Sequence, residues 1–143
     1  MSRQGEFLEW AQYVGHYYGT PRAWVERILQ EGNDVILRVE VQGAQQIRAA
    51  APDAVLIFLV APSWEELHRR LSDRGTEGAQ EIEKRLAAAR EEVRRAHNGP
   101  AGAPLYDYLV VNDDLQQAAN HLACIITAER LRASRAVLPL LEQ

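Results

Sequence analysis

The chain has 143 residues, 47% of them hydrophobic, which is enough for one compact domain with a buried core. Its net charge of −4 and pI near 5.6 argue against general affinity for nucleic acids or membrane surfaces. The one cysteine, Cys124, excludes an internal disulfide and fits a reducing, cytoplasmic setting. The longest apolar run, residues 54–62, is too short to span a bilayer, and residues 1–6 show no apolar signal segment.

The first third of the chain predicts a helix, a strand and a second helix. Thr20 followed by Pro21 is typical of a helix start, and apolar residues recur at helical spacing over 24–29. Gly32 predicts the end of this helix. Residues 34–41 are rich in Val, Ile and Leu and predict a strand, and residues 42–50 predict a short helix.

The remainder alternates between strands and helices. Residues 54–60 are continuously apolar, as in a strand buried on both faces, and the SWEE sequence at 63–66 is a capping box that opens a helix. We then expect a polar loop over 72–80, followed by an amphipathic helix over 81–95. A linker over 97–104 leads to a strand over 108–111 and to a final helix capped by Asp113 or Asp114. The pattern predicts that the final helix buries Leu115, Ala118, Ala119, Leu122, Ile125 and Ile126. This alternation indicates an α/β fold with a parallel sheet covered by helices.

A series of short motifs carries a family resemblance. In chain order they are GEFLEWA at 5–11, YYGT at 17–20, VQGAQQ at 41–46, RGT at 74–76, YDY at 106–108 and VVND at 110–113. The series strongly resembles guanylate kinase, from the middle of its monophosphate-binding region to its C-terminus. The resemblance implies the P-loop nucleoside-monophosphate-kinase fold. It also implies transfer of the γ-phosphoryl group of ATP to GMP with Mg²⁺, in purine nucleotide metabolism.

The resemblance implies a GMP site made of Glu9, Tyr18, Gly19, Thr20 and Glu40. The carboxylate of Glu9 would accept hydrogen bonds from the N1–H and N2–H₂ edge of guanine, which adenine lacks. Tyr18 would donate to the monophosphate, Gly19 would permit close approach, and Thr20 would touch the base. The alternatives are a solvated Glu9 on a short helix, a packed aromatic Tyr18, and a Thr20 that serves as a helix cap.

The strand end at residues 37–43, LRVEVQG, departs from the family pattern at two positions. Glu40 replaces a shorter acid that contacts guanine, so the contact is retained with altered geometry. Arg38 stands where the family has an acid near Mg²⁺, and a cation beside the metal is unfavourable. The alternative is that Arg38 is an outward-facing strand residue without a role.

The remaining site residues lie in the second half of the chain. The resemblance implies that Arg74 and Arg85 belong to a lid that neutralises charge during phosphoryl transfer, with Arg74 also contacting ATP. Asn112 would border the adenine of ATP, at the carboxyl end of a strand. Alternatively, Arg85 is a solvated helix residue, and Asn112 and Asp113 cap the final helix. The histidines show no metal-ligand spacing, so no metal ligand is predicted.

The sequence contains no G-x-x-x-x-G-K-[ST] phosphate loop, and its one lysine, Lys84, has no glycines around it. We therefore expect an N-terminally truncated family member whose donor site for ATP and Mg²⁺ is incomplete and whose activity alone is doubtful. The family's phosphate-loop strand would lie between residues 34–41 and 54–60, so its absence would expose two strand edges and favour self-association.

These expectations divide the chain into one partial domain, residues 1–143. Residues 1–33 would form part of the GMP-binding region, 34–71 the core, 72–90 the lid and 91–143 the C-terminal core. GMP and ATP are the expected ligands, with neither nucleic acid nor membrane as a partner. The alternative function is a non-catalytic guanylate-kinase-like binding module, favoured by Arg38 and by the missing phosphate loop.

Overall fold

A computed structural model describes residues 5–13, 16–73, 78–97 and 103–136. The chain separates into two compact units, residues 1–56 with 87–107 and residues 57–86 with 108–143. Helix α4 (Ala79–His97) contributes residues to both. Within the described ranges, no helix combines the length and apolar character that a membrane span requires.

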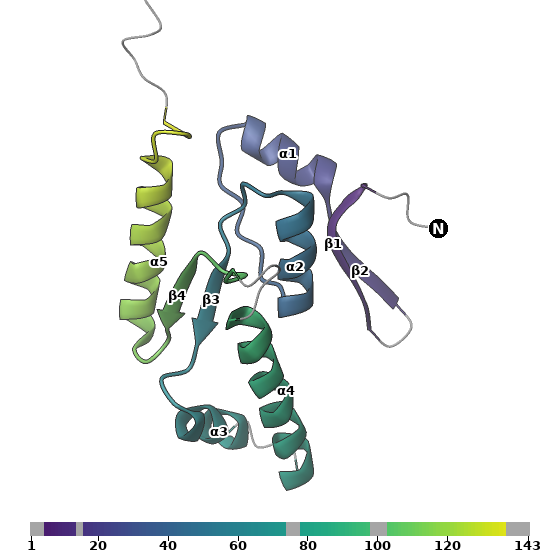
Figure 1. The fold of residues 1–143 in the computed structure, drawn as a ribbon, viewed down its shortest axis with the longest axis vertical. Coiled ribbons are helices and arrows are strands. Elements are labelled where there is room, and N and C mark those ends of the chain that lie inside the picture. Colours follow the sequence, from purple (N-terminus) through teal and green to yellow (C-terminus); the bar gives the residue numbers. More distant parts are fainter. Residues whose placement is uncertain (1–4, 14–15, 74–77, 98–102, 137–143) are drawn as a thin grey trace, which may run out of the picture. The chain divides into compact units, whose positions relative to one another are not determined.

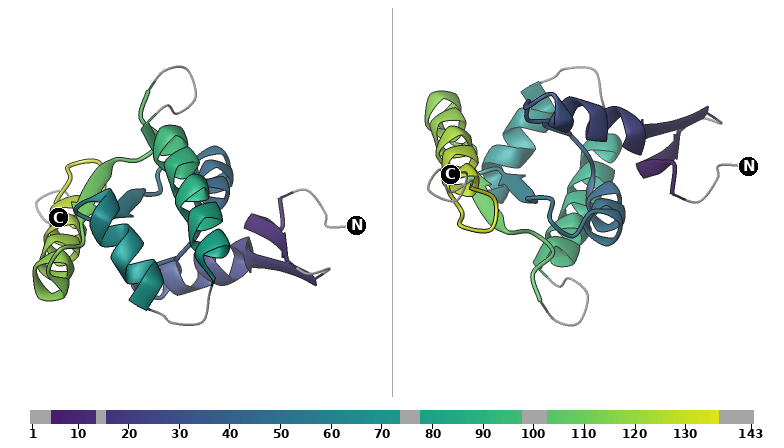
Figure 2. Two further views of the ribbon diagram at one scale, coloured as in Figure 1. Left: turned by 90° about the horizontal axis from the view of Figure 1, so that it is seen from below. Right: turned by 90° about the horizontal axis from the view of Figure 1, so that it is seen from above.

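The first unit begins with an antiparallel hairpin of β1 (Phe7–Tyr13) and β2 (His16–Pro21), which can be followed in Figure 1. Helix α1 (Arg22–Gln30) starts where β2 ends (Figure 2), and α2 (Val41–Ala50) packs against β1. Arg22 ties these pieces together, donating to the carbonyl oxygen of Gly5 at 3.1 Å and to that of Ala50 at 3.0 Å. Apolar residues at one face of each helix are buried in this unit: Val25, Val41, Ala44 and Ile47.

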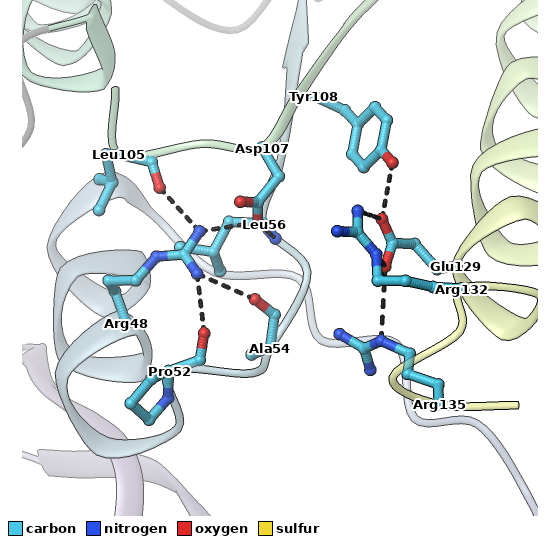
Figure 3. A network of polar contacts seen from close by, with 10 residues as sticks. All are labelled: Arg48, Pro52, Ala54, Leu56, Leu105, Asp107, Tyr108, Glu129, Arg132 and Arg135. Carbon is cyan, nitrogen blue, oxygen red and sulfur yellow. Dashed lines mark hydrogen bonds and ion pairs between the residues drawn. The ribbon is translucent and has the colours of Figure 1, made fainter. Parts of the chain in front are cut away.

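Arg48 of α2 is the centre of a polar network in the first unit (Figure 3). Its guanidinium donates to the carbonyl oxygens of Pro52 at 3.0 Å, Ala54 at 3.2 Å and Leu105 at 3.1 Å. It also donates to a carboxylate oxygen of Asp107 at 2.7 Å. The same carboxylate oxygen accepts from the backbone N–H of Leu56 at 2.7 Å. One side chain therefore joins the end of α2 to the turn that follows it and to a segment that is distant in sequence.

The second unit contains a parallel pair of strands, β3 (Ile57–Val60) and β4 (Tyr108–Val111). Helix α3 (Trp64–Asp73) follows β3, and Ser63 caps it by accepting from the N–H of Glu66 at 3.1 Å. Helix α5 (Leu115–Arg130) follows β4 and packs against it. Its cap is Asp114, which accepts from the N–H of Gln117 at 2.7 Å.

A buried carboxylate joins the end of α5 to β4 (Figure 3). Glu129 is 7% exposed and accepts from the Tyr108 hydroxyl at 2.6 Å and from the Arg132 guanidinium at 2.6 Å, while Arg135 lies 3.4 Å away. The hydrogen bond from Arg132, followed by that from Tyr108, holds the pKa of Glu129 below its usual range. The carboxylate in turn raises the pKa of the Tyr108 hydroxyl.

Most of the expected elements are present. The helices at 42–50 and 81–95 and the strand at 108–111 match α2, α4 and β4, and Gly32 ends α1 with a φ of 81°. The strand predicted over 54–60 is confirmed for Ile57–Val60, but it is not buried on both faces, since Leu59 is 51% exposed. Of the loop predicted over 72–80, residues 74–77 lie outside the described residues. The predicted bounds are too wide, since α3 extends to Asp73 and α4 begins at Ala79.

Three expectations about local structure are wrong. Residues 34–40 form no strand, because within the described part of the chain no neighbouring strand pairs with them. Thr20 does not cap α1, since its hydroxyl donates to a carboxylate of β1 instead. The final helix does not bury its whole apolar pattern: Leu115 is 78% exposed and Ala119 is exposed, whereas Ala118 is buried. Self-association through exposed strand edges stays a prediction.

Candidate functional site

A pocket of about 340 Å³ lies in the first unit, between the hairpin and the segment that leads into α2. This volume is in the range of about 300–1,000 Å³ that small-molecule sites occupy. Three chain segments contribute its lining: Glu9, Trp10 and Ala11 of β1; Tyr18, Gly19 and Thr20 of β2; and Arg38, Val39, Glu40, Gln42 and Gly43. The structure therefore brings all five predicted GMP-site residues to one pocket.

Glu9 is held in place by the opposite strand. It faces Thr20 in the hairpin register, and the Thr20 hydroxyl donates to Glu9 Oε1 at 2.6 Å. The other carboxylate oxygen, Oε2, would lie 3.5 Å from a Cβ placed on Gly43, so it points to the pocket side of α2. Glu9 is half-buried on a strand, so it is neither on a helix nor fully solvated. One oxygen is thus oriented by Thr20, and the carboxylate retains acceptor capacity for a ligand.

Gly19 is required by the packing of the hairpin. A Cβ at this position would lie 2.7 Å from the backbone oxygen of Glu9 and 3.0 Å from side-chain carbons of Phe7 and Trp10. Any larger residue would push the two strands apart and displace Glu9. The glycine therefore supports the pocket through strand approach, whether or not it also lies near a ligand.

Gln46 is a positioning residue that the sequence reasoning missed. Its side-chain amide donates to the carbonyl oxygen of Trp10 and accepts from the N–H of Trp10, both at 3.0 Å. This two-bond contact fixes β1 to α2 one residue after Glu9. The motif VQGAQQ contained the signal, because a glutamine amide can offer both a donor and an acceptor to the backbone N–H and C=O of one residue.

Tyr18 is not a packed core aromatic, since it is 60% exposed beside the pocket. Glu40 is likewise exposed and stands directly before α2, whose first turn begins with Ala44 N–H donating to the Glu40 carbonyl at 2.9 Å. Both side chains are therefore accessible to a ligand in the pocket.

A third carboxylate adds to the negative charge near Glu40. Burial, and then the charge of Glu40, raise the pKa of Glu92 on α4. Burial and the charge of Glu92 in turn raise the pKa of the Tyr106 hydroxyl. Glu92 does not line the pocket itself, so its charge is felt there only through its proximity to Glu40. Sequence reasoning missed Glu92 because its helix pattern gives no sign of the distant Glu40.

Comparisons with known proteins agree on one family. The family model described as guanylate kinase matches residues 1–129. The chain is 53% identical over 133 residues to the guanylate kinases of two strains of Thermus thermophilus, and each match covers 93% of this chain. The chain belongs to the guanylate kinase family. It spans little more than half the length of these Thermus relatives, 57% and 56%.

A comparison with solved structures also identifies a guanylate kinase. The crystal structure of guanylate kinase from Anaplasma phagocytophilum superposes with a TM-score of 0.71 at 31% sequence identity. The match covers 96% of this chain and 63% of that one. The P-loop nucleoside-monophosphate-kinase fold class expected from the motifs is therefore confirmed.

The other residues that the family resemblance implicates belong to the second unit or to undescribed segments. Arg85 is exposed on α4, and Arg74 lies outside the described residues. Asn112 follows β4, where its N–H donates to the carbonyl of Val60 at 2.8 Å. The cap of α5 is Asp114, so neither Asn112 nor Asp113 is needed for that purpose. The roles of Arg74, Arg85 and Asn112 stay predictions.

Arg70 is a further residue that sequence reasoning missed. It donates to the carbonyl oxygen of Asn112 at 2.8 Å and to Glu66 at 2.6 Å. With Arg69, it holds the pKa of Glu66 at about 2. Arg70 thereby fixes α3 to the carboxyl end of β4 and orients the backbone at Asn112.

The pocket residues do not fit the Mg²⁺ ion that guanylate kinases are expected to use. Mg²⁺ prefers oxygen ligands in octahedral geometry. Among the residues that the structure describes, no group of three or more His, Cys, Asp or Glu side chains could hold a metal ion. A guanidinium, Arg38, lines the pocket at the position where the family pattern has an acid. The groups that line the pocket are suited to accept hydrogen bonds, through Glu9 and Glu40, and to bind an anion, through Arg38.

Proposed function

We propose that this chain supplies the GMP-binding part of a guanylate kinase, which transfers the γ-phosphoryl group of ATP to GMP with Mg²⁺. The observation that carries the proposal is the Glu9 carboxylate, held by Thr20 at 2.6 Å in a pocket that also contains Glu40. Membership of the guanylate kinase family supports the choice of nucleotide. Asn112 and Arg74 are proposed for ATP, and Arg74 and Arg85 for charge neutralisation during transfer.

Guanine suits this pocket because its N1–H and N2–H₂ groups are adjacent donors. Glu9 can receive them on a carboxylate that is already oriented, so little side-chain freedom is lost on binding. Glu40 presents a second acceptor from the segment before α2. Adenine offers no such pair of donors. If adenine bound here, the two carboxylates would lose hydrogen bonds to water without gaining hydrogen bonds to the base, which is unfavourable.

The proposal predicts guanine-selective binding. Titration calorimetry of the chain should give tighter binding of GMP than of AMP, and Glu9→Gln should weaken GMP by about tenfold or more, because an amide cannot accept both donors. Glu31→Gln, an exposed carboxylate at the end of α1, is the matched control and should leave GMP binding unchanged. Equal affinity for both monophosphates, or an unaltered GMP affinity in Glu9→Gln, would contradict the guanine assignment.

The same proposal holds that these 143 residues bind without catalysing transfer. A phosphate loop uses consecutive backbone N–H groups and a lysine on the β- and γ-phosphates. Lys84, the one lysine, lies in helix α4 with its ammonium 3.8 Å from Glu81. A coupled assay of ADP release should therefore stay at background, and turnover of about 1–10³ s⁻¹ would refute this part.

A non-catalytic guanylate-kinase-like binding module is the second candidate, and Arg38 is the observation that favours it. Coding DNA directly upstream distinguishes the two candidates. An in-frame glycine-rich phosphate loop there would support the kinase, and its lack would support the binding module. The single cysteine leads us to propose a cytoplasmic location in either case.

A further inference from the structure

Arg38 shares one face of the chain with Glu40. Exposure alternates along the segment before α2: Leu37, Val39 and Val41 are more buried, and Arg38 and Glu40 are exposed. The Cβ atom of Val39 lies on the side of α2, 3.1 Å from where a Cβ of Gly43 would stand. Side chains two residues apart in an extended segment point the same way, and both Arg38 and Glu40 line the pocket.

The guanidinium of Arg38 is not used to hold the fold. Within the described part of the chain it forms neither a hydrogen bond nor an ion pair, although Glu9 and Glu40 line the same pocket. By contrast, Arg22, Arg48 and Arg70 of this chain each bond to carbonyl oxygens of other segments. A planar fork of donors beside a pocket is suited to an anion, since it can bind two oxygens at once.

The pocket therefore has two kinds of recognition groups. Glu9 and Glu40 accept hydrogen bonds and repel anions, whereas Arg38 and the exposed hydroxyl of Tyr18 donate to anions. A neutral nucleoside would satisfy the carboxylates and leave the guanidinium without a partner. A nucleotide that carries both a donor edge and a phosphate satisfies both sets.

We propose that Arg38 binds the phosphate group of the nucleoside monophosphate in this pocket. The inference rests on the proposed function, and it assigns an anion-binding role to the position where the family pattern has an acid. The family has a carboxylate near the metal at this position. Here the arginine would instead place a positive charge directly on the phosphate of the nucleotide that accepts the phosphoryl group. Tyr18 is the second donor to the same phosphate.

The test separates the phosphate from the base by comparing four ligands: guanosine, GMP, adenosine and AMP. Calorimetry on the full chain should show that Arg38→Gln weakens GMP about tenfold and changes guanosine by less than about twofold. Arg38→Lys keeps the charge but not the fork of donors, so it should retain only part of the GMP affinity. Arg27→Gln removes an exposed arginine of α1 that does not line the pocket, and is the matched control.

The outcomes distinguish this inference from the guanine assignment. If Arg38→Gln weakens GMP and AMP alike while wild-type chain prefers neither base, the guanine assignment fails and the phosphate role stands. If wild-type chain prefers guanine but binds guanosine as tightly as GMP, the phosphate role is overturned and the guanine site stands. Equal weakening of guanosine and GMP in Arg38→Gln also overturns it, because the residue then shapes the pocket only. A wild-type chain that binds none of the four ligands contradicts both.

Discussion

The two units of this molecule are each held by a polar network, and the networks are built in opposite ways. In the first unit a single guanidinium, Arg48, donates to three backbone carbonyls and one carboxylate. In the second, a single carboxylate, Glu129, accepts hydrogen bonds from the Tyr108 hydroxyl and the Arg132 guanidinium and forms an ion pair with Arg135. Three of the four acceptors in the first network are backbone carbonyls, which do not titrate, whereas the centre of the second network is itself a titratable carboxylate.

This difference is reflected in the pocket. The hairpin that carries Glu9 is fixed by side chains that bond to other groups of the same unit: Thr20 to Glu9, and Gln46 to the backbone N–H and C=O of Trp10. The Thr20 hydroxyl and the Gln46 amide are both uncharged, so neither contact is an ion pair. The hairpin is thus held without an ion pair to Glu9 or Glu40, so both carboxylates can interact with a ligand in the pocket.

The largest effect is expected from removing the centre of the first network. Arg48→Ala should destabilise the first unit by about 2–4 kcal/mol, because it leaves three carbonyls and one carboxylate without their donor. Amide exchange of Leu56 and Asp107, whose backbone groups bond to each other at 2.8 Å, reports the loss locally. Arg27→Ala on the exposed face of α1 is the control. Arg48→Lys should recover only part of the stability, and full recovery would show that charge alone is sufficient.

A smaller effect should follow from releasing β1. Gln46→Leu removes both bonds to Trp10 and should destabilise the hairpin by about 0.5–1.5 kcal/mol, since water replaces part of the loss at this exposed site. The exchange rate of the Trp10 amide should rise, and GMP affinity should fall without a change in its preference over AMP. Gln45→Leu, the exposed neighbour, is the control. An unchanged Trp10 amide would show that Gln46 does not hold the strand.

The smallest effect at neutral pH is expected from Glu129→Gln, because the amide oxygen can still accept from Tyr108. The lowered pKa of Glu129 means that its contribution is present above the ordinary value of 4.5 and is lost as pH falls through the folded pKa. The wild-type melting temperature should therefore drop further than that of the variant on acidification, and the two should converge. Glu83→Gln on α4 is the control, and parallel acid profiles for wild type and Glu129→Gln would refute the argument.

Local patterns predicted the parts of the fold that depend on local signals. Helices α2 and α4 follow the apolar period, Gly32 ends α1 because its φ is positive, and β4 lies where its apolar run begins and ends. The motif resemblance selected the residues that meet in the pocket. These are features that a short stretch of chain determines by itself.

The failures all concern partners distant in sequence. Residues 34–40 have strand composition, but a strand needs a neighbour for its hydrogen bonds. Thr20 has the features of a helix cap, yet the hairpin register places Glu9 opposite its hydroxyl. Gln46 and Arg48 act on Trp10 and Leu105, contacts that no local pattern could reveal.

The acceptors of Arg48 have a consequence for how this sequence can vary. Three of them are carbonyl oxygens, at Pro52, Ala54 and Leu105, and every residue type carries a carbonyl. As far as the network is concerned, the side chains at those three positions can be exchanged freely, whereas Arg48 has no substitute with the same fork of donors. Only Arg48 and Asp107 therefore constrain the sequence through this network, because theirs are the two side chains that form it.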